Sequence, residues 1–152
     1  MNPTSLIVGI CLFLVVAGVF EGCDRNPLKP RVHVNRGSPL TSVNSAIFKI
    51  RGYAHEHGHL PKANANLADL GEFSVLPEVA AVLEYGGNDS LSLKSPERLI
   101  VLKCVSPVSS ANGVQEFYCA LLSGEILLLQ EKDAILGKSC PLGTGSVVLP
   151  KP

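Results

Sequence analysis

The chain has 152 residues, a length that suits one domain better than two, and 46% of its residues are hydrophobic. Lys plus Arg and Asp plus Glu are equal at 13 each, so the formal net charge is zero. The chain has no basic stripe and no Trp, and therefore lacks the charge and the stacking surfaces that nucleic-acid binding needs. We expect no nucleic-acid partner.

The N-terminal region is dominated by an unbroken apolar run, Leu6 to Phe20. Its 15 residues fall short of the roughly 20 that a membrane-spanning helix needs, but they match the apolar core of an export signal, about 7–15 residues. Gly22 and Cys23 follow closely. An apolar run before a small residue and a Cys resembles the lipobox of bacterial lipoproteins. The resemblance implies that the mature chain begins at Cys23 and carries a lipid there.

An uncleaved membrane anchor is the alternative for residues 1–22. No Lys or Arg precedes the apolar run, whereas Arg25, Lys29, Arg31 and Arg36 follow it. The positive-inside tendency would then place the remaining chain in the cytoplasm. In either case we expect attachment to membrane lipid, through Cys23 or through Leu6 to Phe20. The lipoprotein interpretation places the domain in the cell envelope, at the periplasmic face.

Residues 23–40 are predicted to be a Pro-rich tether. Asp24 to Leu40 contains three prolines, several charges and no sustained periodicity, which is typical of a linker. Such a segment would hold a domain clear of the membrane headgroups.

A helix is predicted from about Ser42 to His57. Thr41 or Ser42 can cap its first free amides, and Gly58 is a natural stop. The residues that recur on one helical face are Val43, Ile47, Ile50 and Ala54. Gly52 costs about 1 kcal/mol relative to Ala inside a helix, so this helix needs support from packing.

The C-terminal half is predicted to be an antiparallel meander of three strands. Residues 98–104 and 116–122 are rich in strand-forming residues, and 125–129 returns along the second of these. Ser123-Gly124 is interpreted as a two-residue hairpin connection. Because 125–129 has little polar alternation, we expect it to be covered on both faces, by its own chain or by a partner.

The remaining segments are short. Residues 66–70 predict one helical turn, and 77–85 is left open between helix and strand. Residues 131–136 predict a last helical turn, and 137–152, rich in Gly and Pro, is predicted to be an irregular tail. The fold class is therefore α+β, with a long N-terminal amphipathic helix packed on a small antiparallel sheet in a domain spanning residues 41–136.

Three segments share a pattern with a known family. Ala46 to Leu70 carries Tyr-Ala, His-Gly and Leu-Pro before a short helical segment, Ser95 to Cys104 combines a Ser-Pro turn with an apolar strand, and Glu116 to Glu131 reads as a terminal hairpin. In this order they resemble pseudopilins, the pilin-like subunits of type II secretion and related systems. The resemblance covers about residues 43–133. It implies a pilin-like fold and a non-enzymatic binding or assembly subunit with protein partners in a secretion or pilus-like assembly.

Two segments are candidate contact surfaces for such partners. One is the hairpin Tyr118 to Leu128, which we expect to be exposed, and the other is the long loop Val105 to Gln115.

Three cysteines lie in the predicted domain: Cys104, Cys119 and Cys140. Cys104 and Cys119 are on successive predicted strands and could face each other. A disulfide between them would contribute about 3 kcal/mol by closing a loop in the unfolded chain. The alternative is three free thiols that pack as small apolar side chains.

His55, His57 and His59 form the one local cluster typical of a metal site. Two of them are four residues apart, the spacing that places imidazoles on one helix face, but the predicted helix end at Gly58 lies between them. They support a competing hypothesis of a small metal-binding or sensing membrane protein. Otherwise they are a polar helix C-terminus that interacts favourably with the dipole. The sequence has no nucleophile elbow and no complete phosphate loop, so we expect neither an enzyme nor a cofactor.

Overall fold

A computed structural model describes residues 38–110, 112–149 and 151, all of which belong to the second of the two units into which the chain divides, Val34–Pro152. The predicted anchor, Cys23 and most of the predicted tether lie outside the described residues. No helix in the described part combines the length and the apolar character that a membrane span requires.

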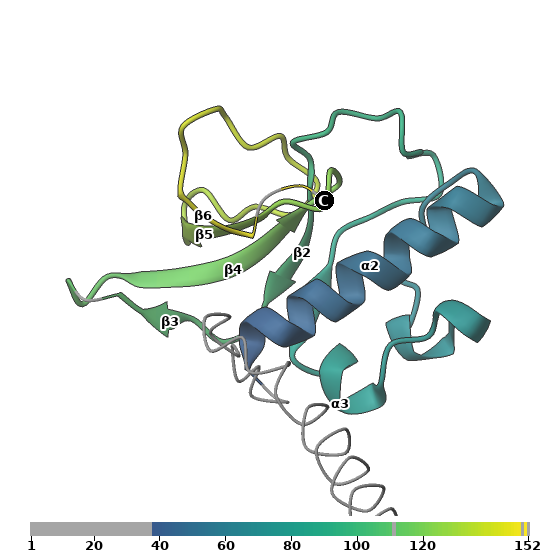
Figure 1. Ribbon diagram of the computed structural model, residues 1–152, viewed down its shortest axis with the longest axis horizontal. Coiled ribbons are helices and arrows are strands. Elements are labelled where there is room, and N and C mark those ends of the chain that lie inside the picture. Colours follow the sequence, from purple (N-terminus) through teal and green to yellow (C-terminus); the bar gives the residue numbers. More distant parts are fainter. Residues whose placement is uncertain (1–37, 111, 150, 152) are drawn as a thin grey trace, which may run out of the picture. The chain divides into compact units, whose positions relative to one another are not determined.

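The described fold is α+β, with the long helix α2 (Pro39–His57) packed on a six-stranded antiparallel sheet (Figure 1). The strands are β1 (Leu83–Tyr85), β2 (Ile100–Cys104), β3 (Val108–Ser109), β4 (Gln115–Leu121), β5 (Ile126–Gln130) and β6 (Ser146–Leu149). Their order is β1-β2-β4-β5-β6, and β3 pairs with β4. Between α2 and β1 in the chain come the short helices η1 (Leu67–Asp69), η2 (Gly71–Phe73) and α3 (Pro77–Ala80).

The helix predicted over residues 42–57 is observed, but it begins earlier, at Pro39. Ser38 is the residue that caps it, since its hydroxyl oxygen accepts a hydrogen bond from the backbone N–H of Thr41 at 3.2 Å. Proline suits the first helical position because its φ is already helical and its missing N–H would be unpaired there. Residues 39 and 40 therefore belong to the helix and not to the tether. The helix ends as predicted, with Gly58 in the left-handed region at φ 75°.

Gly52 is explained by the packing of η2 against α2. A Cβ at this position would lie 2.9 Å from Cε1 of Phe73, so glycine allows the ring to approach the helix closely. One turn earlier, Lys49 Nζ donates a hydrogen bond to the carbonyl oxygen of Glu72 at 3.0 Å. The support from packing that Gly52 requires is thus supplied by η2.

The sheet is covered on both faces by the chain's own residues. One face packs against α2, and its buried residues include Val101, Leu102, Cys104, Ala120, Leu122 and Ile126. The other face is covered by the segment that follows β5, and its buried residues include Ile100, Phe117, Cys119, Leu121, Leu127, Leu129, Ala134 and Cys140. We call these the helix face and the tail face. The two-sided covering expected for residues 125–129 is confirmed, and the chain itself provides it.

Several sequence predictions about the C-terminal half are wrong in detail. The predicted three-stranded meander has six strands, because 77–85 divides into α3 and β1 and two further short strands pair with β4 and β5. The hairpin turn has three residues, Leu122 to Gly124, with Gly124 at φ 94°, the geometry of a type I turn followed by a left-handed residue. Residues 131–136 form turns and no helix.

The predicted irregular tail also contains β6. Its short apolar stretch pairs with β5 through Leu127 and Val147. Gly145 immediately precedes it at φ 75°, and a Cβ there would collide with the backbone oxygen of Leu128. Glycines next to a strand of four residues make such a sequence look irregular, although here they permit the close approach that the pairing needs.

Candidate functional site

The three histidines do not form a common site. His57 stacks on the ring of Tyr53, with centroids 4.0 Å apart and planes 8° apart, and its Nδ1 lies 3.0 Å from the carbonyl oxygen of Tyr53. His59 follows the helix end, and its Nδ1 lies 2.9 Å from the carbonyl oxygen of Leu60. His55 is exposed on another side of α2, because residues two apart on a helix do not face each other. Among the described residues no group of three or more His, Cys, Asp or Glu is arranged to hold a metal ion.

His57 and His59 instead take part in an aromatic cluster at the end of α2. The ring of Phe73 meets Tyr53 edge-on at 6.1 Å and His57 at 6.2 Å, and the two imidazoles are 6.3 Å apart. Because carbonyl oxygens only accept hydrogen bonds, the Nδ1 atoms of both histidines must donate. The cluster holds η2 against the helix, and this is a structural role.

Cys104 and Cys119 do not form the disulfide that the sequence left possible. The residue opposite Cys119 is Lys103, so its neighbour Cys104 points to the other face of the sheet. Cys104 lies on the helix face, where its thiol is 3.6 Å from the carbonyl oxygen of Pro39, and Cys119 and Cys140 lie on the tail face. All three cysteines are free and buried. The alternative of free thiols packed as apolar side chains is the one observed.

Burial also makes two of these thiols poor nucleophiles. It raises the pKa of Cys104 to about 11 and that of Cys119 to about 12, because a thiolate is poorly solvated inside the fold. At neutral pH both remain protonated. The cysteine predicted to carry a lipid, Cys23, lies outside the described residues.

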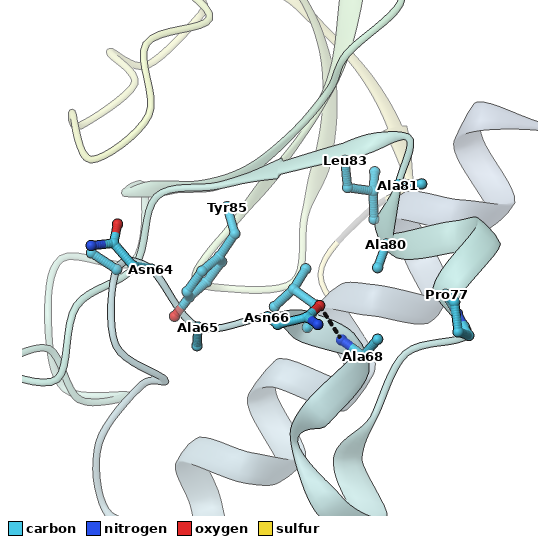
Figure 2. A pocket seen from close by; sticks show the side chains of 11 residues that line it. Asn64, Ala65, Asn66, Ala68, Pro77, Ala80, Ala81, Leu83 and Tyr85 are labelled. Atoms are coloured by element: carbon cyan, nitrogen blue, oxygen red, sulfur yellow. Dashed lines mark hydrogen bonds between the residues drawn. The ribbon is translucent and has the colours of Figure 1, made fainter.

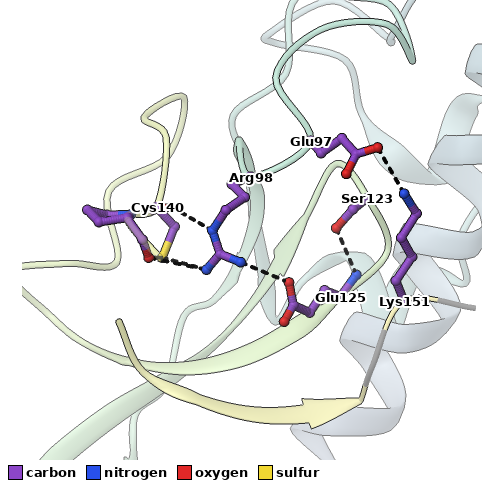
Figure 3. A network of polar contacts seen from close by, with 7 residues as sticks. Glu97, Arg98, Ser123, Glu125, Cys140 and Lys151 are labelled. Carbon is purple, nitrogen blue, oxygen red and sulfur yellow. Dashed lines mark hydrogen bonds and ion pairs between the residues drawn. The ribbon is translucent and has the colours of Figure 1, made fainter. Parts of the chain in front are cut away.

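Arg98 ties the C-terminal segment to the β4–β5 hairpin (Figure 3). Its Nε donates to the carbonyl oxygen of Cys140 at 2.8 Å, and its Nη2 donates to that of Pro141 at 3.2 Å. Its Nη1 forms an ion pair with Oε2 of Glu125 at 3.2 Å. We call these contacts the Arg98 clamp. Sequence reasoning placed a turn before the strand here but missed the clamp, since its partners are 27 to 43 residues away in the chain.

The two predicted contact surfaces have different outcomes. The hairpin Tyr118 to Leu128 is not exposed, because residues 119–124 are buried. The segment 105–115 does reach the surface, although it is not simply a loop, since β3 within it pairs with β4. Val105 is 49% exposed and Val114 is 40% exposed. Of the two surfaces, only this one is available for contact.

A hollow that the sequence did not indicate lies between residues 63–68 and the segment from Pro77 to Tyr85 (Figure 2). It has a volume of about 490 Å³, and no charged side chain lines it. Leu83 and Tyr85 of β1 line it on one side, and the polar residues Asn64 and Asn66 are among those that line the other.

Tyr85 fixes one end of this hollow. Its hydroxyl donates a hydrogen bond to the carbonyl oxygen of Pro61 at 2.8 Å, and burial raises its pKa well above the usual value. Gly87 makes this possible, since a Cβ there would overlap the Tyr85 hydroxyl. The phenol is thus a fixed, neutral wall and not an acid or base at physiological pH.

A second hollow of about 290 Å³ adjoins the first and shares Asn64 and Ala65 with it. Tyr53, His59 and Lys62 contribute to its lining, so this end carries a cation.

The chain matches no protein-family model, no curated protein and no solved structure. Function is therefore inferred from the chain's own residues.

Proposed function

We propose that this chain is a non-enzymatic, membrane-anchored binding or assembly subunit with a pilin-like domain. A lipid on Cys23, or the uncleaved run Leu6 to Phe20, would attach it to the membrane, and the lipoprotein form would place the domain at the periplasmic face of the cell envelope. The proposal joins the apolar N-terminal run, the resemblance to pseudopilins and the described fold.

The observation that carries the proposal is the position of α2. The helix begins at Pro39, in the last two residues of the segment predicted to be a tether, and then packs along the sheet. The thiol of Cys104 on β2 lies 3.6 Å from the carbonyl oxygen of Pro39, so the first turn of the helix is in contact with the sheet. A helix that follows an anchor segment and packs on an antiparallel sheet is the arrangement that the resemblance implies.

The described surface supports a role in contact with other proteins. Phe48 lies in the middle of α2 and is 77% exposed. Val82 immediately precedes β1 and Val105 immediately follows β2; a backbone hydrogen bond of 3.0 Å joins them, and they are 42% and 49% exposed. Exposed apolar side chains of this size lower the free energy of association when a partner covers them.

The roles of the polar groups also favour binding over catalysis. Each of three polar groups holds one segment of the described fold against another: the Arg98 clamp, the Tyr85 hydroxyl and the aromatic cluster at the end of α2. The thiols of Cys104 and Cys119 are protonated at neutral pH. These groups stabilise the fold that presents the surface, a role that suits a binding subunit.

Cross-linking of the full chain in its native membranes tests the binding or assembly role. The native chain should give cross-linked species of defined mass, and Phe48→Ser should reduce their yield while leaving the melting temperature unchanged. Leu142→Ser is the matched control, because Leu142 is also highly exposed but lies on the C-terminal segment. A chain that remains a monomer at every cross-linker concentration would contradict the proposal.

A further inference from the structure

One edge of the sheet is unpaired along β1. The backbone N–H of Val105 donates to the carbonyl of Val82, and the N–H of Gly86 donates to that of Val101, both at 3.0 Å. Because backbone groups of alternate residues in a strand point to opposite edges, those of Leu83 and Tyr85 point away from β2. Within the described residues these groups have no hydrogen-bond partner.

The larger hollow adjoins β1. Leu83 and Tyr85 line it on one side and residues 63–68 on the other, as Figure 2 shows. A peptide strand pairs with a sheet edge at a spacing of about 4.8 Å and advances about 3.4 Å per residue. The volume of about 490 Å³ is therefore sufficient for a few residues of an extended chain beside β1.

The lining of the two hollows indicates which side chains would fit. Five alanines line the larger hollow, together with uncharged residues only, so small and neutral side chains fit there. The adjoining hollow contains Lys62, which forms no ion pair in the described part of the chain. An acidic group is the complementary charge at that end.

We propose that the free edge of β1 and its hollow bind an extended segment of a partner protein by adding a strand to the sheet. The segment would place small apolar residues beside Leu83 and Tyr85 and an acidic residue opposite Lys62. Its main-chain hydrogen bonds supply affinity and its side chains supply specificity, as in other cases of strand addition. This names the partner chemistry for the binding or assembly subunit proposed above and rests on that proposal.

The first test is a binding selection with the full chain in detergent micelles. The probe is a library of hexapeptides with Ala, Val, Ser or Thr at five positions and Asp, Glu or Lys at the last. Members with Asp or Glu should be enriched. Methylation of the alternate backbone nitrogens that face β1 in a selected peptide should weaken its binding at least tenfold, since each methyl group removes a hydrogen bond to the edge. No binding, or equal binding of acidic and lysine-containing members, would overturn the proposal.

Amide hydrogen exchange then identifies the edge that is used. In the free full chain the amides of Leu83 and Tyr85 should exchange rapidly, while that of Glu84, which faces β2, should be protected. A selected peptide should slow exchange at Leu83 and Tyr85 at least tenfold and leave Glu84 unchanged. Protection that appears on β6 instead, at the opposite edge of the sheet, would overturn the assignment.

Two substitutions separate the parts of the site. Lys62→Glu should weaken acidic peptides about tenfold and favour lysine-containing ones, whereas Lys132→Glu, on the segment after β5, should change neither. Ala81→Trp should fill the hollow and abolish binding, and Leu142→Trp is its control for added bulk. Ala81 and Leu142 are both exposed, so the fold should tolerate a tryptophan at either position.

The failure of this inference differs from the failure of the proposed function. If no peptide binds but the chain still forms cross-linked assemblies, only the assignment of the β1 edge is wrong. If peptides bind at β1 but the chain neither attaches to membranes nor assembles, the proposed function is wrong. Self-association that Ala81→Trp abolishes would identify a second copy as the occupant and overturn the proposal of a separate partner.

Discussion

The two faces of the sheet are covered in different ways. On the helix face a regular element, α2, places its apolar stripe against the strands, and the stripe has the spacing that the sequence displays. On the tail face an irregular segment covers the strands with single buried residues such as Ala134 and Cys140. The Arg98 clamp holds this segment in place. A hydrophobic face can thus be covered without any periodic pattern, if specific contacts fix the covering segment.

The largest expected effect is the loss of stability caused by a charge buried on the tail face. Leu127 and Leu129 are 1% and 0% exposed, so Leu127→Asp or Leu129→Asp would place a carboxylate among apolar side chains. We expect a loss of more than about 4 kcal/mol, enough to unfold the domain.

Urea denaturation of the full chain in micelles measures this loss. Val147→Asp is the control, because Val147 is 58% exposed on β6 and should change stability by no more than about 0.5 kcal/mol. Unaltered unfolding of Leu127→Asp would mean that the tail segment does not cover this face.

The next effect concerns the clamp itself. Arg98→Gln removes an ion pair and two charge-assisted hydrogen bonds to backbone carbonyls, at a cost of about 2–3 kcal/mol. Amide exchange should accelerate in residues 134–145 and remain unchanged in α2. Lys151→Gln breaks only the exposed pair with Glu97 and should cost almost nothing. Equal acceleration on both faces would contradict the distinction between them.

A smaller effect is expected at Gly52, where α2 packs against Phe73 of η2. Alanine favours a helix by about 1 kcal/mol over glycine, but here its Cβ would press on Phe73. Gly52→Ala should therefore stabilise the chain by about 1 kcal/mol only when Phe73→Ala is also present, which a double-mutant cycle measures. The same gain in the native background would show that the ring is not held against the helix.

The smallest expected effect is a difference in thiol reactivity between the two faces of the sheet. In the Arg98→Gln variant, Cys119 and Cys140 should react with a thiol reagent faster than Cys104, because Cys119 lies under the loosened segment and Cys140 belongs to it. Mass spectrometry of labelled peptides measures the order. Equal rates for all three would indicate that only global unfolding exposes them.

The raised thiol pKa values also predict a pH dependence with a definite sign. The unfolded thiols ionise near pH 9.0, while the folded Cys104 ionises at about 11, so the unfolded chain releases protons first. The contribution of the buried thiols to the free energy of unfolding is therefore fully present below pH 9 and decreases as the pH rises toward 11. Unfolding titrations at pH 7 and pH 10 should show this decrease, and Cys104→Ala should reduce it. A free energy of unfolding that does not change across this range would contradict the burial of the thiols.

The parts of the fold predicted from the sequence are those with a local signal. The helical stripe from Val43 to Ala54 and the stop at Gly58 were sufficient for α2, and strand-forming residues located β2, β4 and β5. Contacts between distant segments could not be read in this way. The strand register that separates Cys104 from Cys119, and the clamp from Arg98 to Cys140, depend on tertiary pairing that no local pattern encodes.

The candidate site shows the same limit. The three histidines are close in sequence, yet His55 is exposed on another side of α2 while His57 and His59 pack together in the aromatic cluster. The hollow beside β1 combines residues 63–68 with 77–85, and these segments have ordinary small and neutral side chains. Only the unpaired edge of β1, which depends on sheet order, makes the hollow a candidate for binding.

The most direct test of a membrane-anchored subunit is the intact mass of the protein purified from the membranes of its native host. We expect a mass that matches residues 23–152 plus a diacylglycerol or triacyl modification on Cys23. A full-length, unlipidated chain in the membrane fraction would leave the apolar run as the anchor and contradict the periplasmic placement. A full-length, unlipidated chain found only in the soluble fraction would contradict membrane attachment itself.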